Sequence, residues 1–333
     1  GILYLEHRQT DSAFAPKSLQ ILSMLSTQIA ISVDNAMLYR DQRLLTESYS
    51  RFVPQEFITF LGKESIRDVS LGDQVERDMT ILFSDMRNFT SISETMTPEN
   101  NFNFLNDYLA RVSPIVRANE GFIDKYIGDA IMALFPKHPV DAVNTAIAIQ
   151  AEIRRHNDTL PQGSPARLEV GIGIHGGSLM LGTIGERERL ETTVISDAVN
   201  VASRLESLTK AYGTPIIVSE AIVRGLDPSD RFMCRYLDTV RPAGKTQAIE
   251  LWEIIDGMTN EIRELKLASK PAFDEGLRLF REKRFAEAAT IFRNILIENP
   301  GDIPARIYRD RALYWTTHRI NESWDGIQIL RNK

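Results

Sequence analysis

The chain has 333 residues, of which 43% are hydrophobic and 25% charged, and its formal net charge is −6. This length predicts two or three domains of ordinary globular composition, and the negative charge argues against a nucleic-acid partner, which usually requires a basic face. The single cysteine, Cys234, excludes an internal disulfide and a zinc-binding cysteine cluster and fits a reducing, cytoplasmic compartment, while the apolar runs are too short to predict a transmembrane segment.

The N-terminal part is predicted to hold a strand over residues 2–6 and, after Pro16, a helix over 17–51 that ends before Pro54. The chain starts without Met inside a strand-like run, so we expect it to be a piece of a longer protein. Apolar residues recur every seven positions along the helix, which favours a parallel coiled-coil seam over 17–52. These residues are Met24, Ile31, Leu38, Leu45 and Phe52. The alternative is an amphipathic helix that packs on a single domain.

The next informative stretch is a buried strand that ends in a carboxylate. The apolar run 81–83 predicts the strand, Asp85 follows it, and residues 88–91 can open a helix because Asn, Ser and Thr are good N-caps. An acid at the start of a helix can bind a cation, and a phosphate bound to that cation can then face the helix N–H groups.

A second carboxylate lies in a predicted hairpin. Gly128 and Asp129 separate two apolar runs over 122–135, as in a two-residue turn. Two acids at the tips of neighbouring strands, Asp85 and Asp129, can hold two divalent cations. The alternative for either acid alone is that it caps a turn.

The rest of this region alternates between strands and helices and predicts an α+β sandwich of antiparallel strands with helices on one face. In chain order we expect a helix over 97–119, the hairpin, a helix over 140–157, strands over 168–174 and 179–184, a helix over 196–212 and strands over 216–218 and 250–254.

Two glycine-containing motifs and one histidine are predicted not to form ligand sites. The glycines over 171–176 fit G-x-G-x-x-G, but a strand rather than a helix follows, so we expect them to shape a hairpin. Residues 243–246 end like a phosphate-binding loop, but Thr239 stands where the first glycine belongs. His175 is expected to be a packed or hydrogen-bonded side chain.

Three motifs together resemble the signature of the class III nucleotide cyclases. They are F-S-D-M-R-N-F-T at 83–90, K-Y-I-G-D-A-I-M-A-L-F at 125–135 and D-A-V-N-V-A-S-R-L-E at 197–206. The similarity covers about residues 51–256. It implies a ferredoxin-like catalytic domain over 53–256 that works as a head-to-tail homodimer, with each active site shared between two protomers.

The resemblance also assigns roles to residues. Asp85, Asp129 and the backbone carbonyl of Met86 correspond to the ligands of two Mg²⁺ or Mn²⁺ ions per site. Asn200 and Arg204, four residues apart on one helix face, correspond to the pair that acts on the ribose and on the charge developing at the α-phosphate. The predicted phosphate-binding residues are Asn88, Phe89, Thr90 and Lys245.

Two further residues concern the nucleotide base. Lys125 matches the lysine that reads the adenine edge, because lysine only donates hydrogen bonds and adenine N1 accepts them. Thr193 stands where many members have Asp, which resembles the class IIIb subgroup, of which some members respond to bicarbonate. The implied function is an adenylate cyclase acting on ATP; the alternatives are a guanylate cyclase and a catalytically silent dimerisation or scaffold module.

Both ends of the chain carry weaker resemblances. Residues 1–16, with the start of the long helix, are similar to the last strand and exit helix of a GAF sensor domain, which implies an upstream sensor that regulates the enzyme. Residues 257–333 show a helix–turn–helix pattern similar to a single tetratricopeptide repeat. One such repeat cannot bury its own face, so we expect it to pack on the catalytic domain or on the partner protomer, with Trp324 and Ile327 anchoring its end.

Overall fold

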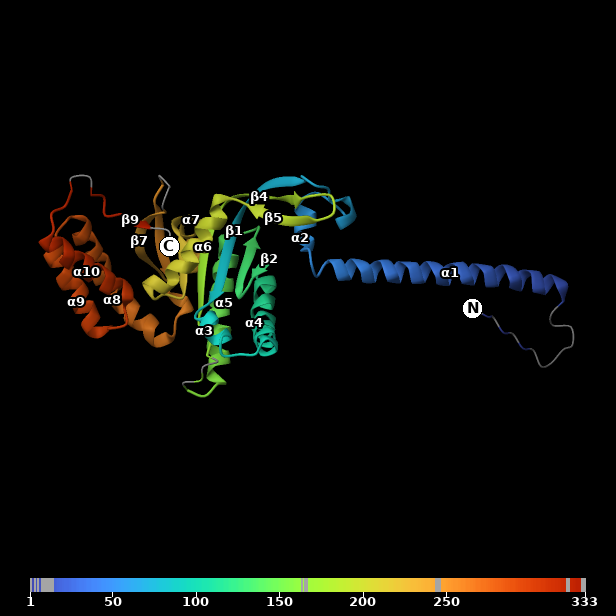
Figure 1. Cartoon of the computed structure of the whole chain (residues 1–333), viewed down its shortest axis with the longest axis horizontal. Helices are drawn as coiled ribbons and strands as arrows, with labels where there is room; N and C mark the ends of the chain where they lie inside the picture. Colours follow the sequence, from blue (N-terminus) through green and yellow to red (C-terminus); the bar gives the residue numbers. More distant parts are fainter. Residues whose placement is uncertain are drawn as a thin grey trace. The chain divides into compact units, whose positions relative to one another are not determined.

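A computed structural model of the chain describes residues 15–162, 164, 167–242, 247–321 and 324–330, together with Ile2, Tyr4 and Glu6 (Figure 1). The predicted GAF remnant over 1–16 and the predicted phosphate ligand Lys245 therefore lie largely or wholly outside the described residues. The chain divides into two compact units, Gly1–Ile58 and Thr59–Lys333.

The first unit consists mainly of one helix, α1, over Pro16–Tyr49. It ends before Pro54, as predicted, and none of its residues is buried within the chain; Met24 and Leu38 of the heptad series are 71% and 67% exposed. By length and composition α1 could cross a membrane, contrary to the expectation from the apolar runs, but one such helix near an N-terminus is weak evidence. The coiled-coil seam remains a prediction. A short helix, α2, follows over Gln55–Phe60.

The second unit is built on a nine-stranded sheet with the order β2-β3-β1-β4-β6-β8-β7-β9, in which β5 pairs with β4 beside this path. The strands are β1 Gln74–Met86, β2 Phe122–Ile127, β3 Ala130–Phe135, β4 Val170–Gly185, β5 Leu190–Ile195, β6 Ile216–Ser219, β7 Cys234–Pro242, β8 Ile249–Ile254 and β9 Gln328–Leu330. The four strands β2-β3-β1-β4 are antiparallel neighbours, which is the order of the predicted ferredoxin-like core.

The helices of this unit cap and cover the sheet. They are α3 Phe89–Ser93, α4 Pro98–Ala118, α5 Pro139–Asp158, α6 Asp197–Tyr212, α7 Glu220–Gly225, α8 Asn260–Arg281, α9 Phe285–Glu298 and α10 Ile303–Thr317, with short 3₁₀ turns at Ile66–Asp68, Pro228–Asp230 and Ile255–Gly257. Helices α4 and α6 begin where the sequence predicts, because the Thr97 and Ser196 side chains accept hydrogen bonds from the first-turn backbone.

The prediction that all helices lie on one face of the sheet is wrong. Ile172 and Ile174 of β4 belong to the core formed with α4 and α5, whereas the intervening Gly173 faces α6. Successive strand residues point to opposite faces, so α6 covers the face opposite to α4 and α5.

The predicted hairpin at the glycines of β4 is also wrong. Residues 170–185 form one continuous strand, and the turn comes later, between β4 and β5. The glycines instead allow close packing, since a Cβ atom at Gly173 would lie 2.1 Å from the Glu206 nitrogen and 2.5 Å from the Ala202 oxygen, both in the backbone of α6. No helix follows these glycines directly, which excludes the dinucleotide-binding alternative. His175 shares a 2.7 Å hydrogen bond with the Ser219 hydroxyl, as expected for a packed histidine.

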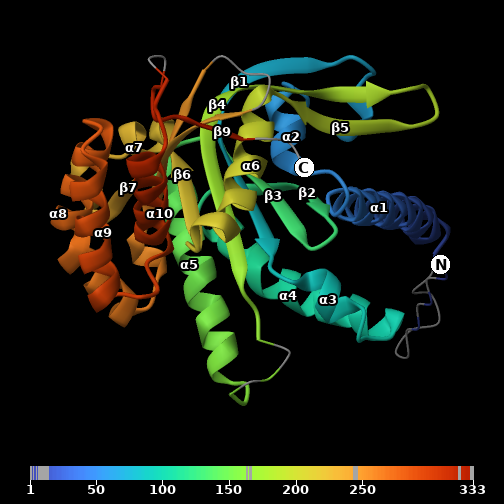
Figure 2. The same ribbon diagram turned by 60° about the vertical axis from the view of Figure 1, so that its left-hand side comes forward.

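The C-terminal helices α8, α9 and α10 lie side by side at the β7 end of the sheet (Figures 1 and 2), and polar contacts join them to β7 and β8. Their core is aromatic: Phe273, Phe292 and Tyr308 stack or meet edge to face at centroid distances of 5.4–6.1 Å. Trp324 contacts Phe280 at 5.7 Å, which confirms that it anchors the end of the chain. The segment thus packs on the catalytic unit of its own chain; the tetratricopeptide resemblance stays a prediction.

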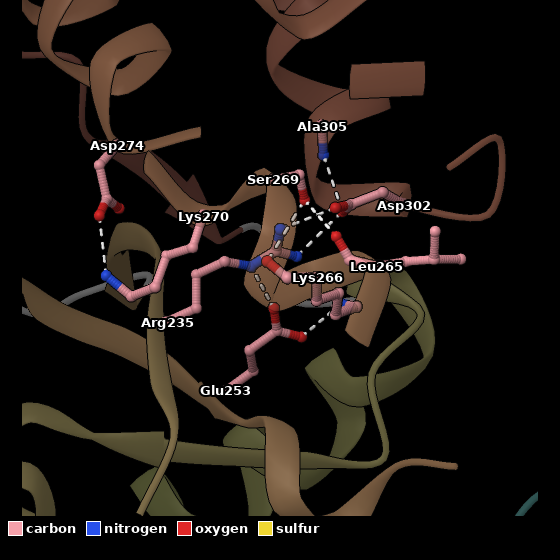
Figure 3. Close-up of polar contacts among 9 residues, drawn as sticks. All are labelled: Arg235, Glu253, Leu265, Lys266, Ser269, Lys270, Asp274, Asp302 and Ala305. Carbon is pink, nitrogen blue, oxygen red and sulfur yellow. Dashed lines mark hydrogen bonds and ion pairs between the residues drawn. The ribbon is translucent and has the colours of Figure 1, made fainter. Parts of the chain in front are cut away.

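A buried, charge-balanced cluster joins these helices to the sheet (Figure 3). The Arg235 guanidinium of β7 donates to both carboxylate oxygens of Asp302, at 2.7 and 2.9 Å, and also to Glu253 of β8. The other Glu253 oxygen accepts from Lys266 of α8 at 2.7 Å. Asp302 also caps α10 by accepting from the Ala305 nitrogen. Burial favours the neutral acids, but Lys266 and Arg235 outweigh it and hold the pKa of Glu253 below its ordinary value.

We expect Asp302→Ala to lower the free energy of unfolding by about 3–5 kcal/mol, because it leaves the guanidinium of a fully buried arginine partly unpaired. Asp325→Ala is the matched control, because Asp325 also pairs with an arginine of β7, Arg241 at 3.1 Å, but its side chain is 49% exposed. We expect this variant to lose less than about 1 kcal/mol of unfolding free energy. Urea unfolding of both variants measures the difference, and equal losses would contradict the role given to the buried cluster.

Candidate active site

Two carboxylates meet at the end of the central strands. Asp85 is the penultimate residue of β1, and Asp129 lies in the two-residue turn of the β2–β3 hairpin, where Ile127 pairs with Ala130. Gly128 takes a φ of 64°, which a glycine adopts without strain. Because Ser84 of β1 pairs with Ile131 of β3, the turn lies beside Asp85, and the two carboxyl groups are close enough for the charge of Asp129 to act on Asp85.

The pKa of Asp85 indicates what this pair can hold. Burial, followed by the charge of Asp129 and the hydrogen bond to it, raises the pKa of Asp85 to about 6. Two carboxylates that repel each other in a half-buried site fit divalent cations, which would relieve both the repulsion and the lost hydration. In the part of the chain that the structure describes, no group of three or more acidic, His or Cys side chains could hold a metal. Further ligands would therefore come from backbone oxygens, such as that predicted for Met86, and from substrate phosphates.

The segment after Asp85 turns directly into α3. Asn88 occupies the N-cap position with a left-handed φ of 60°, and α3 begins at Phe89. The Asn88 side chain makes no capping hydrogen bond, so the helix starts through backbone geometry and not through the side chain that the sequence suggests.

Arg87, which the sequence analysis does not single out, lies within this same segment. Its Nη2 donates to the Thr214 carbonyl at 3.0 Å, just beyond the end of α6, and the buried Nε has no partner among the described residues. Arg87 therefore ties the strand end that carries Asp85 to the loop after α6.

Helix α6 presents the two predicted transition-state residues. Asn200 is exposed and Arg204 is half-buried, and Arg204 has no ion-pair partner among the residues that the structure describes. An ion pair between Arg204 and the nearby Glu206 is not observed among the described residues, and the basic group that lowers the pKa of Glu206 is Arg87. Arg204 is thus available for an anionic ligand.

Glu206 of α6 is a further partly buried acid near the carboxylate pair. Burial, together with the charge of Asp85, raises its pKa to about 7. The Glu206 carboxyl reaches back to β4, since a Cβ atom at Gly171 would lie 2.7 Å from Glu206 Oε1. Glu206 therefore adds to the negative potential behind the carboxylate pair.

The predicted base-reading residues come together. Lys125 Nζ donates to Thr193 Oγ1 at 3.3 Å, although 68 residues separate them, and it lies 3.9 Å from Glu191. Asp124 lies 3.6 Å from Lys125 Nζ, has a side chain that is only 1% exposed, and neither of its oxygens has a hydrogen-bond partner in the described structure. A register shift between Ile123 and Lys125 makes Asp124 the extra residue of a bulge.

The predicted residues therefore form three groups within one chain: Asp85 with Asp129, Lys125 with Thr193, and Asn200 with Arg204. Among the described residues, no hydrogen bond or ion pair joins the carboxylate pair to either other group. Lys245 lies outside the described residues. One chain thus carries all three groups of predicted residues.

We expect Gly173→Ala to reduce activity strongly, because its Cβ would overlap the α6 backbone and push Asn200 and Arg204 away from β4. Gly176→Ala on the same strand is the control, since its Cβ would meet Ile222 Cδ1 at an ordinary 3.4 Å. Thermal unfolding and turnover of both variants provide the test, and similar behaviour of the two would contradict the close packing of α6.

Comparison with known proteins agrees with this geometry. Residues 72–255 match the sequence model described as "Adenylate and Guanylate cyclase catalytic domain". An adenylate cyclase of Anabaena cylindrica is 46% identical over 215 residues, which is 62% of this chain and 43% of that protein. The terminal-differentiation-specific adenylate cyclase of Dictyostelium discoideum is 36% identical over 271 residues, which is 79% of this chain and 13% of that protein.

A solved structure shows the same fold. A bacterial light-regulated adenylyl cyclase superposes with a TM-score of 0.58 at 23% identity, covering 71% of this chain and 67% of that one. The chain spans less than half of the length of the two curated relatives that it matches.

Proposed function

The chain belongs to the adenylate and guanylate cyclase catalytic domain family, and we propose that it converts ATP to 3′,5′-cyclic AMP and pyrophosphate with two Mg²⁺ or Mn²⁺ ions per site. The observation that carries the proposal is the contact between Asp85 and Asp129, with the pKa of Asp85 raised by burial and by its neighbour. The two similar adenylate cyclases support ATP as the substrate.

In the proposed reaction the ribose 3′-oxygen forms a bond to the α-phosphorus of the same nucleotide. The 3′-hydroxyl loses its proton to solvent, the bond from the α-phosphorus to the bridging oxygen breaks, and pyrophosphate leaves with that oxygen. Divalent cations supply charge neutralisation and activation of the attacking oxygen when bound. Asp85, Asp129 and the Met86 carbonyl would hold these cations.

The remaining roles fall to groups that donate hydrogen bonds or carry positive charge. Arg204, free of ion pairs in the described structure, would stabilise the charge developing at the α-phosphate, and Asn200 would orient the ribose. The backbone of residues 88–90 and Lys245 would bind the β- and γ-phosphates.

Lys125 and Thr193 would select adenine. Their 3.3 Å hydrogen bond holds the ammonium donor beside a hydroxyl that can accept from the adenine amino group. Threonine at this position also motivates assignment to class IIIb and a response to bicarbonate. If turnover stays unchanged when bicarbonate is added at fixed pH, the proposed bicarbonate response is wrong.

The proposed enzyme is a homodimer in which one protomer supplies the carboxylates and its partner supplies Lys125, Thr193, Asn200 and Arg204. This arrangement is supported by the lack, among the described residues, of a hydrogen bond or ion pair between the carboxylates and these four residues. It is also supported by large apolar side chains on the β2–β3 and β4–β5 hairpins that are 44–62% exposed. They are Tyr126, Ile127, Ile184, Leu190 and Ile195. In this proposal α1 pairs as a coiled coil and couples an upstream GAF-type sensor to the dimer in the cytoplasm.

The test is product formation by the purified chain with ATP or GTP and with Mg²⁺ or Mn²⁺, using Asp85→Ala protein prepared identically as the blank. Cyclic AMP from ATP, with little product from GTP, is expected. Product mainly from GTP would show a guanylate cyclase and overturn the roles of Lys125 and Thr193. No product from a demonstrated dimer would leave the scaffold alternative.

A further inference from the structure

The C-terminal helices touch the helix that carries Asn200 and Arg204. The last turn of α6 ends at Gly213, whose φ is 58°, and a Cβ there would lie 2.5 Å from Ile303 Cγ1 in the first turn of α10. Ile307 of α10 packs on the core that α6 shares with β6, β7 and β8. Helix α10 therefore covers the C-terminal end of α6.

A single buried carboxylate connects α6, α10 and the sheet. Asp238 of β7 is 2% exposed, and its Oδ2 accepts from the Tyr212 hydroxyl of α6 and from Arg311 Nη1 of α10, both at 2.6 Å. Its Oδ1 accepts from the Tyr308 hydroxyl of α10 at 3.0 Å and from the Thr239 nitrogen at 2.8 Å. Four donors satisfy the lone pairs of a carboxylate.

The charges around Asp238 keep its hydrogen-bond donors protonated. Burial and the neighbouring negative charge of Asp238 raise the pKa of both Tyr212 and Tyr308 above the ordinary value, so both phenols remain protonated donors. Burial would lower the pKa of Arg311, but Asp238 and the surrounding groups raise it instead. The ion pair is therefore balanced, and each tyrosine holds its helix to the same anchor.

We propose that the C-terminal helical segment α8–α10 positions α6, with Asp238 as the positioning residue that acts through Tyr212; the proposal rests on the proposed cyclase function. Arg204 and Tyr212 lie on one rigid helix, eight residues or about 12 Å apart along its axis. A shift at the anchored end moves Arg204 relative to the α-phosphate, and an error of about 1 Å in such a group can reduce turnover by about 100-fold.

The second junction of the same helices provides an internal control. The cluster of Arg235, Glu253, Lys266 and Asp302 also joins α8 and α10 to the sheet, but its hydrogen bonds and ion pairs among the described residues involve no residue of α6 (Figure 3). Loss of Lys266 there removes a tie between α8 and the sheet but leaves the Asp238 contacts with Tyr212, Tyr308 and Arg311 in place.

The test compares Tyr212→Phe with Tyr236→Phe in the full chain. Each variant loses one hydroxyl hydrogen bond, since the Tyr236 hydroxyl meets Thr239 Oγ1 at 2.7 Å on β7 without touching α6. We expect Tyr212→Phe to lower kcat by about 10-fold with KM for ATP nearly unchanged, because Arg204 acts in the transition state. Tyr236→Phe and Lys266→Met are expected to keep kcat.

Hydrogen exchange and a rescue variant separate positioning from general stability. Amide exchange in residues 197–212 is expected to speed up in Tyr212→Phe and Arg311→Met but not in Tyr236→Phe, and Arg311→Lys is expected to restore most of the kcat lost in Arg311→Met. Equal kcat losses in both tyrosine variants, or unchanged kcat and exchange in Tyr212→Phe, would overturn the proposal. If the wild-type chain makes no cyclic nucleotide, the proposed activity fails by itself, and the exchange comparison alone decides the positioning role.

Discussion

Asp85→Ala and Arg204→Ala proteins are each expected to be inactive, and mixing them is expected to restore about a quarter of wild-type activity. Loss of Arg204 removes charge stabilisation that is typically worth about 10²–10³-fold in turnover, and loss of Asp85 removes a cation ligand. In a two-fold dimer, random exchange makes about half of the dimers mixed. Each mixed dimer holds one site with both defects and one intact site, so about a quarter of all sites recover.

The control for this experiment is a mixture in which both defects fall on the same side of the site. Asp85→Ala mixed with Asp129→Ala is expected to stay inactive, since every site then lacks one carboxylate. Native mass spectrometry must show that mixed dimers form in both cases. Mixed dimers of Asp85→Ala and Arg204→Ala without any regained turnover would rule out an active site shared between protomers.

The proximity of Asp85 and Asp129 was predictable because it depends on the local sequence pattern around each acid. Each acid follows or precedes a short apolar strand, and antiparallel pairing of two such strands brings their tips together. Helices with a Ser or Thr N-cap, such as α4 and α6, were predictable for the same local reason.

The features that the sequence did not predict depend on contacts between distant segments. The glycines of β4 resemble turn residues, but their small size serves the approach of α6 from the other side of the strand. Strand β7 was missed because Arg235 and Asp238 resemble solvent-facing positions, whereas in the fold both are buried and bonded to distant groups at α10. Asp124 lies in a bulge that no local pattern indicates.

The metal-free protein is expected to become more stable when Asp85 is replaced by Asn, while its activity is lost. Asp85 has an ordinary pKa of 3.8 but about 6 in the fold, so the unfolded chain ionises first as pH rises. The free energy of unfolding therefore falls between about pH 4 and pH 6, and it stays at this lower value above pH 6. After allowance for the solvent exposure of this half-buried group, we expect a gain of about 1–2 kcal/mol for Asp85→Asn at pH 8.

The same argument gives the cation response. Mg²⁺ or Mn²⁺ must displace the proton on Asp85, so the stabilisation of the wild-type chain by either ion is expected to rise with pH up to about 6 and to disappear in Asp85→Asn. Asp78→Asn, an exposed acid on the same strand, is the control and should keep the full cation response. Thermal unfolding of the three proteins at pH 5 and pH 8, with and without the ion, decides the matter. Equal stabilisation of wild type and Asp85→Asn would place the cation elsewhere, whereas its loss in Asp85→Asn alone would mean that the fold gives up stability to keep a carboxylate ready for the metal.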